Sequence, residues 1–335
     1  MQSSPFKICV IGCGEIAFGY HGPAYARYAA DYLNTELSGC CSRTLNKAAL
    51  FAEKFGFHNC YTDFIEMVEA EQPSVVCINV PPEAICEITC AVLQKGIPTL
   101  LEKPPGMTIA ETDRMIAAAE ASTTPNQVAF NRRFMPLTRA LISRLEQRYQ
   151  PDDIHHLQIE FTRVNRGNED FSTTAIHGID LARFVARSDF ASINFHYQEV
   201  HLPGIQAANT YLDGTFNSGA TAHISFCPLA GVATERCTVH AYNNSFYLQL
   251  PIWNEYDTSG RLIHIEEGKT VFELTGIEAA GTTHDYVLNG FYAENETFFN
   301  HIRENRQPEM NIRQSRQSVE IMEAMRERRS EFRPR

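Results

Sequence analysis

The stretch ICVIGCGEIA (Ile8–Ala17) decides the fold of this chain. An apolar, β-branched run leads directly into Gly12-x-Gly14, and a small residue follows at Ala17. The run predicts a buried strand, and the residues after the glycines predict the start of a helix. Gly12 permits a tight turn, Gly14 lets a ligand approach the backbone, and Ala17 lets the helix pack on the strand. A glycine turn that binds no ligand is the competing interpretation.

Strand-like and helix-like segments alternate over the first 130 residues. The strand-like runs are almost entirely apolar, which is typical of a parallel sheet covered by helices on both faces. These runs are Lys7–Ile11, Leu37–Cys41, Val75–Val80, Thr99–Leu101 and Gln127–Phe130. Apolar residues at helical spacing occupy Asn46–Phe55, Phe64–Ala70, Ala84–Lys95 and Glu111–Ala121. The alternation predicts a doubly wound α/β domain over residues 1–128.

The pattern changes after about Asn131. Apolar and polar residues then alternate with a period of two, separated by turn-forming Asn, Asp and Gly, at Leu157–Phe161, Ala220–Phe226 and Phe246–Leu250. Phe291–Met325 returns to helical spacing. The sequence predicts an α+β domain over residues 129–335, with an antiparallel sheet that leaves one face open. We expect this face to expose apolar residues such as Phe246 and Leu248 or their neighbours, and therefore to assemble a homodimer or homotetramer.

Composition and charge exclude several classes of protein. A chain of 335 residues favours two domains, and 44% hydrophobic with 21% charged residues is typical of globular proteins. A net charge of -11 argues against nucleic-acid or anionic membrane partners. No apolar run reaches the roughly 18 residues of a membrane span, and the N-terminus lacks a signal-peptide core. Ten scattered cysteines favour reduced thiols and a cytoplasmic location, and the twelve histidines lack metal-ligand spacing, so no metal is expected.

The second strand-like run carries information on the cofactor. It ends at Ser42-Arg43, where an acidic residue would bind the ribose 2′-hydroxyl of NAD. A hydroxyl and a guanidinium suit the 2′-phosphate of NADP instead, because the planar fork of arginine matches phosphate oxygens. The sequence therefore favours NADP over NAD. A solvated turn arginine is the alternative interpretation of Arg43.

The fourth strand-like run leads into Glu102-Lys103-Pro104. This place is the carboxyl end of a strand, where open α/β sheets bind ligands. A lysine here is a candidate for proton transfer, although a lysine after a strand can also be merely solvated.

With these segments assembled, the sequence resembles the glucose–fructose oxidoreductase / inositol dehydrogenase (Gfo/Idh/MocA) family over essentially the whole chain. The resemblance rests on IGCGEIA at residues 11–17, Glu102-Lys103-Pro104, FNRRFMPL at 130–137 and AIHGIDLARF at 175–184. It implies a Rossmann-type domain that binds NAD or NADP, and a second domain that binds substrate and forms oligomers. It also implies hydride transfer between the cofactor and a sugar, cyclitol or related hydroxyl compound. The implied cofactor contacts are Gly12, Gly14, Glu15, Ile16, Ser42, Arg43, Pro81, Glu102 and Lys103.

The resemblance implies that Lys103 and His177 line the reacting carbon. Alcohol oxidation needs a base for the hydroxyl proton, and the reverse reaction needs an acid. Ser172 and Thr173 mark a helix start, and Thr173, His177 and Asp180 share one face of that helix. The positive end of the helix dipole favours a neutral imidazole. Asp180 either orients the ring or satisfies a buried donor, and a satisfied core histidine is the alternative for His177.

Two positions depart from the family pattern. Thr173 stands where inositol-dehydrogenase-like members carry Asp, and Ile85 stands where the family often carries His. Asp170 and Glu169 are the nearest carboxylates in sequence. Five polar residues either bind an anionic group of substrate or cofactor, or belong to an interface or a solvated surface: Arg132, Arg133, Arg163, Asn165 and Arg166.

Two functions follow from these residues. One is an NAD(P)-dependent oxidoreductase acting on a carbohydrate-like compound, favoured by Lys103 and His177. The other is a catalytically silent, nicotinamide-binding regulatory protein of the same fold, favoured by the missing carboxylate at Thr173. Redox-neutral chemistry on a tightly held cofactor, such as glycoside cleavage, is a third interpretation.

Overall fold

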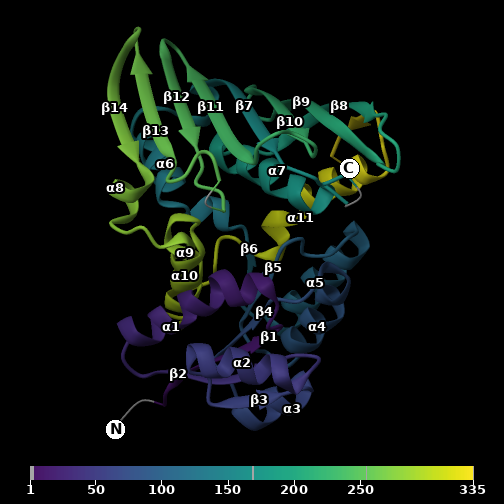
Figure 1. Cartoon of the computed structure of the whole chain (residues 1–335), viewed down its shortest axis with the longest axis vertical. Helices are drawn as coiled ribbons and strands as arrows, with labels where there is room; N and C mark the ends of the chain where they lie inside the picture. Colours follow the sequence, from purple (N-terminus) through teal and green to yellow (C-terminus); the bar gives the residue numbers. More distant parts are fainter. Residues whose placement is uncertain (1–3, 168–169, 254, 335) are drawn as a thin grey trace. The chain divides into compact units, whose positions relative to one another are not determined.

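The computed structural model describes residues 4–167, 170–253 and 255–334 (Figure 1). The chain forms two compact units. The first extends to Phe130 and includes Phe291–Val319, and the second comprises Asn131–Gly290 and the chain from Glu320 onward. The sequence pattern predicted domains of 1–128 and 129–335, so the two descriptions differ mainly in where Phe291–Val319 belongs.

The first unit contains a six-stranded sheet in the order β3-β2-β1-β4-β5-β6, in which every pairing is parallel. Its strands are β1 (Phe6–Ile11), β2 (Thr35–Cys41), β3 (Asn59–Tyr61), β4 (Val75–Ile78), β5 (Thr99–Glu102) and β6 (Asn126–Ala129). The doubly wound parallel sheet is thus confirmed, since β4 is buried along its whole length. The short edge strand β3 was not predicted.

Helices follow the strands of this sheet. They are η1 (Ala17–His21), α1 (Gly22–Asp31), α2 (Leu45–Phe55), α3 (Phe64–Glu71), α4 (Pro82–Gln94), α5 (Ile109–Ser122), α10 (Phe291–Arg303) and α11 (Ile312–Arg326). Local chemistry sets their starts, as at α3, where the Asp63 carboxylate accepts from the backbone N–H groups of Ile65 and Glu66. The apolar stripe predicted in α4 is buried, with Ile85 and Leu93 both inaccessible to solvent.

Aromatic packing ties α10 to the first unit. The ring of Phe299 lies 4.8 Å from that of Tyr28 and 6.1 Å from that of Phe6, measured between centroids. The Tyr28 hydroxyl donates to Asn300 over 2.8 Å, although the two residues are 272 positions apart. Such contacts join Phe291–Val319 to the first unit, and local sequence patterns carry no signal for them.

The second unit contains a nine-stranded sheet in the order β14-β13-β12-β11-β7-β10-β9-β8-β15. All neighbours are antiparallel except β7 and β10, which are parallel, so the sheet is mixed where the sequence predicted an antiparallel one. The strands are β7 (Ile154–Thr162), β8 (Phe190–Val200), β9 (Ala207–Phe216), β10 (Thr221–Cys227), β11 (Thr234–Ala241), β12 (Asn244–Gln249), β13 (Arg261–Glu266), β14 (Lys269–Thr275) and β15 (Glu331–Phe332).

Two long helices pack on this sheet, α6 (Pro136–Arg148) against β12 and β13, and α7 (Ser172–Ala186) against β7 and β10. The shorter helices are η2 (Asn131–Phe134), η3 (Pro151–Asp153), α8 (Gly276–Ala280) and α9 (Asp285–Leu288). Together with the sheet they enclose a single cluster of buried apolar side chains that includes Leu141, Phe161 and Phe226. The predicted α+β character of this region is confirmed.

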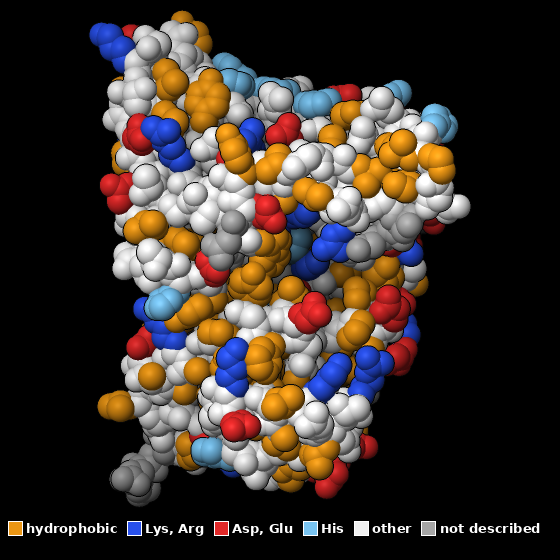
Figure 2. Space-filling model, in the orientation of Figure 1, with side chains coloured by type: hydrophobic (Ala, Val, Ile, Leu, Met, Phe, Trp, Pro, Cys, Tyr) orange, Lys and Arg blue, Asp and Glu red, His pale blue; other side chains and the backbone are white. Residues whose placement is uncertain are grey.

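The two faces of the nine-stranded sheet differ in polarity. Phe246 and Leu248 are 0% and 1% exposed and belong to the core, so the open face exposes their neighbour Tyr247, which is 40% exposed, instead of these two residues. Their neighbours Ser245 and Tyr247 point the other way. Figure 2 shows histidine side chains gathered along the rim that these strands form. The alternation of apolar and polar residues does not show which face of a strand the helices cover. In this strand the helices cover the face that carries Phe246 and Leu248.

Within the described ranges, no helix is long and apolar enough to cross a membrane. The helices α7 and α11 contain 15 residues each, below the roughly 20 that a spanning helix needs.

Candidate active site

The glycine loop lies at the carboxyl end of β1, beside β4, where the strand order of the sheet reverses. The backbone N–H of Gly12 donates to the carbonyl of Cys41 over 2.8 Å. The N–H of Asn79 donates to the carbonyl of Ile11 over 2.7 Å. These bonds hold the loop between the ends of β2 and β4, at the position where open parallel sheets bind ligands.

The two glycines of the loop have different surroundings. Gly12 has φ +101°, and a Cβ there would lie 2.2 Å from the carbonyl oxygen of Asn79, so only glycine fits. A Cβ at Gly14 would meet no described atom within 4 Å. Glu15 and Ile16 follow with exposed side chains. The backbone at Gly14 is therefore accessible, and the loop fits the pyrophosphate of a dinucleotide.

The ends of β2 and β4 supply the neighbouring predicted contacts. Ser42 is half-buried and Arg43 is exposed directly after β2. Among the described residues, none forms a hydrogen bond or ion pair with the Arg43 side chain. Pro81, also exposed, immediately precedes α4. A guanidinium not engaged by the protein suits an anionic group of a bound molecule.

Glu102, at the end of β5, is engaged within the first unit. Its carboxylate lies 2.9 Å from Nε2 of the buried His21 and accepts from the backbone N–H of Lys103 over 3.1 Å. Nδ1 of His21 lies 3.2 Å from the amide nitrogen of Asn295, on α10. Burial raises the pKa of Glu102, but the hydrogen bond with His21 and the charge of Lys103 outweigh burial and lower it below its usual value. These contacts fix the strand end from which Lys103 projects.

Sequence reasoning did not assign a role to His21. The available signal was the His21-Gly-Pro23 stretch beside the glycine loop. Its partners are far away in sequence, with Asn295 separated by 274 positions.

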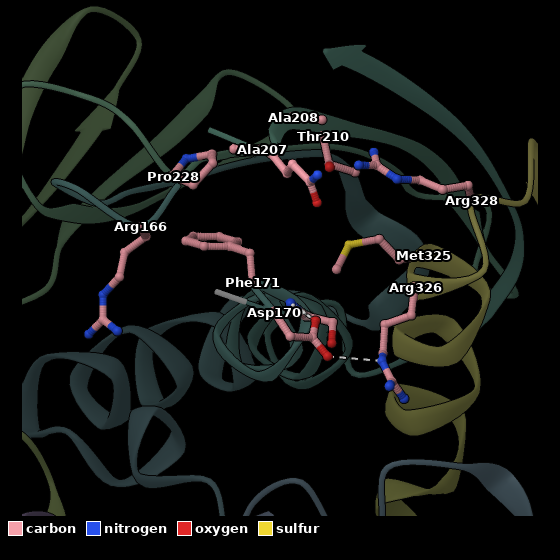
Figure 3. A pocket seen from close by; sticks show the side chains of 12 residues that line it. Arg166, Asp170, Phe171, Ala207, Ala208, Thr210, Pro228, Met325, Arg326 and Arg328 are labelled. Carbon is pink, nitrogen blue, oxygen red and sulfur yellow. Dashed lines mark hydrogen bonds and ion pairs between the residues drawn. The ribbon is translucent and has the colours of Figure 1, made fainter. Parts of the chain in front are cut away.

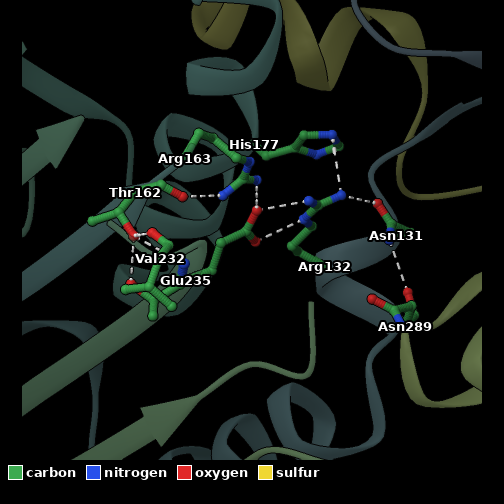
Figure 4. Close-up of polar contacts among 9 residues, drawn as sticks. Asn131, Arg132, Thr162, Arg163, His177, Val232, Glu235 and Asn289 are labelled. Atoms are coloured by element: carbon green, nitrogen blue, oxygen red, sulfur yellow. Dashed lines mark hydrogen bonds and ion pairs between the residues drawn. The ribbon is translucent and has the colours of Figure 1, made fainter. Parts of the chain in front are cut away.

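A buried ion cluster surrounds His177 in the second unit (Figure 4). Arg132, from η2, donates to the Glu235 carboxylate through Nε over 2.9 Å and through Nη2 over 2.7 Å. Arg163, just after β7, donates to the same carboxylate. Glu235 lies on β11 and is inaccessible to solvent. Burial raises the pKa of Glu235, but the charges of Arg132 and Arg163 outweigh burial and lower it below its usual value.

The contact between Arg132 and His177 identifies the protonation state of the imidazole. Nη1 of Arg132 lies 3.2 Å from Nε2 of His177. A guanidinium has only donors, so Nε2 must accept and the ring proton sits on Nδ1. His177 in this contact is therefore neutral, in agreement with the state expected from its place near the start of α7.

The other predicted residues of α7 form their own contacts. The helix begins at Ser172, as predicted. Asp180 is buried and accepts from Nε and Nη2 of Arg133, both over 2.6 Å, so it satisfies a buried donor, which is one of its two expected roles. The Thr173 hydroxyl donates to the backbone carbonyl of Asp170 over 3.1 Å. Glu169 lies outside the described residues.

Three of the five polar residues singled out in the sequence are buried rather than solvated: Arg132, Arg133 and Arg163. In the ion pairs among the described residues, Arg132 and Arg163 share the single carboxylate of Glu235, and Arg133 pairs with Asp180, so these three pairs together carry one positive charge. Sequence reasoning missed Glu235. The signal was its place on the same strand face as Cys237 and Val239, because a carboxylate among inward-facing residues needs a buried partner.

Lys103 belongs to the first unit and His177 to the second. Among the described residues, no group of three or more His, Cys, Asp and Glu side chains could hold a metal ion.

A parallel sheet with a glycine loop at its switch point defines a dinucleotide-binding protein of the Rossmann type. Residues 6–130 match the family model described as "Oxidoreductase family, NAD-binding Rossmann fold". Over these residues, which are less than half of the chain, the sequence is similar to the Gfo/Idh/MocA oxidoreductases.

Similarity to curated proteins covers part of the chain. D-glucoside 3-dehydrogenase of Escherichia coli (strain K12) is 31% identical over 141 residues, which are 42% of this chain and 39% of that protein. Levoglucosan dehydrogenase of Pseudarthrobacter phenanthrenivorans is 26% identical over 162 residues, 44% of this chain and 41% of that protein. The chain thus spans about two fifths of the length of the curated relatives it matches.

Similarity of fold extends over the whole chain. An oxidoreductase domain protein from Kribbella flavida superposes with a TM-score of 0.81 at 19% identity, covering 99% of this chain and 100% of that one. A levoglucosan dehydrogenase in complex with NADH gives a TM-score of 0.82 at 18% identity, covering 98% and 99% of the two chains. At these identities the likeness establishes the shared fold.

Proposed function

We propose that this protein is an NAD(P)-dependent oxidoreductase that transfers a hydride between the nicotinamide and a hydroxyl or carbonyl group of a sugar, cyclitol or related compound. The observation that carries the proposal is the accessible Gly14 backbone at the switch point of a parallel sheet. The curated relatives support a carbohydrate substrate, because three of them are dehydrogenases of a glucoside, apiose and levoglucosan.

The residues proposed to hold the cofactor line the carboxyl edge of the parallel sheet. They are Gly12, Gly14, Glu15, Ile16, Ser42, Arg43, Pro81, Glu102 and Lys103. When bound, the nicotinamide supplies or accepts the hydride. Glu102 acts here by fixing the strand end, since its carboxylate bonds to His21 and to the Lys103 backbone.

Lys103 and His177 are proposed as the acid–base groups. In the oxidative direction, a neutral amine or imidazole takes the substrate hydroxyl proton, and in the reductive direction the protonated group returns it. Arg132 disfavours an imidazolium at His177, because both groups would then be positive and Nε2 already accepts a bond. Because Nδ1 already carries the ring proton, His177 can take a substrate proton only at Nε2, after the bond from Arg132 breaks. The excess positive charge of the cluster would stabilise an alkoxide.

We propose NADP as the preferred form of the cofactor, because Ser42-Arg43 replaces an acidic ribose ligand and the Arg43 guanidinium is exposed. The Kd values of NADPH and NADH should differ by roughly tenfold in favour of NADPH. Arg43→Asp should reverse or abolish that difference in a fluorescence titration. Equal affinities in the parent, unchanged by the substitution, would contradict the preference.

The proposed activity is tested by following the near-ultraviolet absorbance of reduced nicotinamide with a panel of glucosides, free sugars and inositols. We expect substrate-dependent absorbance changes in the parent, and changes that are slower by roughly a hundredfold or more in Lys103→Met. A regulatory protein without turnover is the second candidate, favoured by Thr173 in place of a carboxylate. It predicts tight cofactor binding with no absorbance change for any compound, and redox-neutral chemistry predicts product without a net change in absorbance.

A cytoplasmic location and assembly through the nine-stranded sheet are also proposed. The outer face of this sheet is polar, so an interface there would rely on hydrogen bonds of residues such as Tyr247 and His240 rather than on exposed apolar area. Sedimentation velocity at micromolar concentration should show a dimer or tetramer. A monomer would contradict the assembly.

A further inference from the structure

A pocket of about 300 Å³ lies in the second unit (Figure 3). Neither Arg132 nor His177 lines it. Its walls come from the chain before and at the start of α7, from β9, and from the end of α11. This volume corresponds to the lower end of small-molecule sites. Of the residues singled out in the sequence, Arg166 and Asp170 line it, whereas Lys103, His177 and the residues of the glycine loop do not.

Arginines dominate the charge of this pocket. Arg166 lies on one side, and Arg326 and Arg328 lie on the opposite side (Figure 3). Asp170 is the one carboxylate in the described lining, and its oxygen lies 2.9 Å from Nε of Arg326. Arg328 lies 3.4 Å from the exposed carboxylate of Glu199, and its guanidinium lies 4.7 Å from the centre of the Tyr197 ring. Arg326 and Arg328 each present a planar fork of donors to the pocket, and such forks match the oxygens of a carboxylate or a phosphate.

A buried hydroxyl points to the same kind of ligand. Ser172 lines the pocket, is 2% exposed, and its Oγ has no hydrogen-bond partner among the described residues. A buried hydroxyl without a partner is costly, and a ligand oxygen in the pocket would satisfy it. Ser172 is also the first residue of α7, a helix of 15 residues whose positive end faces this region.

The remaining wall is apolar. The ring of Phe171 and the side chain of Met325 extend toward the centre of the pocket, with Pro228 and Ala207 beyond them (Figure 3). Such a wall suits the C–H surface of a compact organic molecule more than a hydrated inorganic ion.

We propose that this pocket binds a small organic anion, held through its carboxylate or phosphate group by Arg326, Arg328 and the Ser172 hydroxyl, with its body against Phe171 and Met325. Sugar acids and sugar phosphates both offer this chemistry. All described residues of this pocket belong to the second unit, and none of them is proposed to transfer a proton or to hold the cofactor. Loss of redox activity would therefore leave the proposal intact.

Isothermal titration calorimetry without nicotinamide tests the site, with gluconate, glucose 6-phosphate, glucose and inorganic phosphate as probes at constant ionic strength. We expect gluconate or glucose 6-phosphate to bind and glucose not to bind. The probe with the lower Kd shows whether the pocket prefers a carboxylate or a phosphate group. Arg328→Gln should weaken binding roughly tenfold or more, and Ser172→Ala roughly three- to tenfold. The matched control is Arg329→Gln, which removes an equal charge one position away, from a side chain paired with Glu327.

Arg328 is about half exposed, so its replacement should leave the thermal midpoint unchanged. Binding of the organic anions that also weakens with added salt would support the site. Absence of binding by both organic anions, equal binding of glucose, or an equal loss in Arg329→Gln would overturn the proposal. Binding of inorganic phosphate alone would overturn it as well, because the apolar wall would then have no role.

Discussion

The glycine loop of the first unit and the ion cluster of the second unit use different parts of the chain to make a polar site. The loop relies on backbone groups at the ends of neighbouring parallel strands, and its shape depends on the absence of a Cβ at Gly12. The cluster relies on charged side chains, with Arg132 and Glu235 separated by 103 positions and buried together.

This difference predicts how each site responds to substitution. A backbone site should tolerate changes in most side chains, but not an added carbon where the chain is crowded. A buried ion cluster should tolerate no single removal, because each partner leaves an uncompensated charge behind. The predictions below test this contrast, and the first asks whether the two units serve one reaction.

The largest effects are expected for Lys103→Met in the first unit and His177→Ala in the second. Each should lower turnover by roughly a hundredfold or more, the scale of a positioned acid–base group. The affinity for NADPH should change far less than turnover in both variants, and least in His177→Ala, because His177 is not among the residues proposed to hold the cofactor. Steady-state kinetics and a fluorescence titration measure the two quantities. If His177→Ala were nearly silent, the second unit would not supply an acid–base group.

Glu235→Gln should cost about 3 kcal/mol of unfolding free energy, because Arg132 and Arg163 would lose their buried counter-charge. The matched control is Glu266→Gln, which removes an equal charge from an exposed pair with Arg148 and should leave stability almost unchanged. Urea unfolding at neutral pH gives both values. Equal losses of unfolding free energy in Glu235→Gln and Glu266→Gln would show that the buried ion pairs contribute no more to stability than an exposed pair.

The same pair of variants gives a pH dependence with a definite sign. Because the folded-state pKa of Glu235 is lowered, its ionised form stabilises the fold at pH values above its ordinary pKa of about 4.3. That contribution is lost as the pH falls from there through the lower folded-state pKa. Unfolding free energy should therefore fall on acidification less steeply in Glu235→Gln than in the parent. Identical slopes would mean that Glu235 does not titrate differently in the two states.

Two alanine substitutions separate the roles of the glycines. Gly12→Ala should destabilise the protein by about 1–3 kcal/mol, since its Cβ would meet the Asn79 carbonyl and φ is positive. Gly14→Ala should leave the thermal midpoint unchanged but weaken NADPH binding by roughly tenfold, because its Cβ would project into the space proposed for the pyrophosphate. Unchanged binding in a stable Gly14→Ala would place the cofactor elsewhere.

The smallest effect is expected for Thr173→Ala. Its hydroxyl donates to the carbonyl of Asp170 and cannot titrate near neutral pH, so its loss should lower turnover by less than about tenfold. Steady-state kinetics beside His177→Ala provides the comparison. If Thr173→Ala abolished turnover, the assignment of proton transfer to His177 would be wrong, and Asp170 would be the next group to replace.

The sequence by itself determined the elements whose signals are local. Apolar runs and helical stripes located the strands and helices of the parallel sheet, the glycines located its loop, and Ser172 marked the start of α7. Each of these features depends on residues within one or two turns of the chain, or on the conformations that glycine alone adopts easily.

The tertiary structure decided every feature that depends on contacts between elements far apart in the sequence. It brought Phe299 against Tyr28, paired β7 with β10 in parallel, and turned Phe246 inward. It also enclosed Glu235 between two arginines. A period of two places residues on alternating faces of a strand, but it does not predict which face the helices will cover. The position of a charged residue in the sequence likewise does not predict which residue it will pair with. Those choices follow from packing and burial over the whole unit, where an unpaired charge costs far more than any local preference.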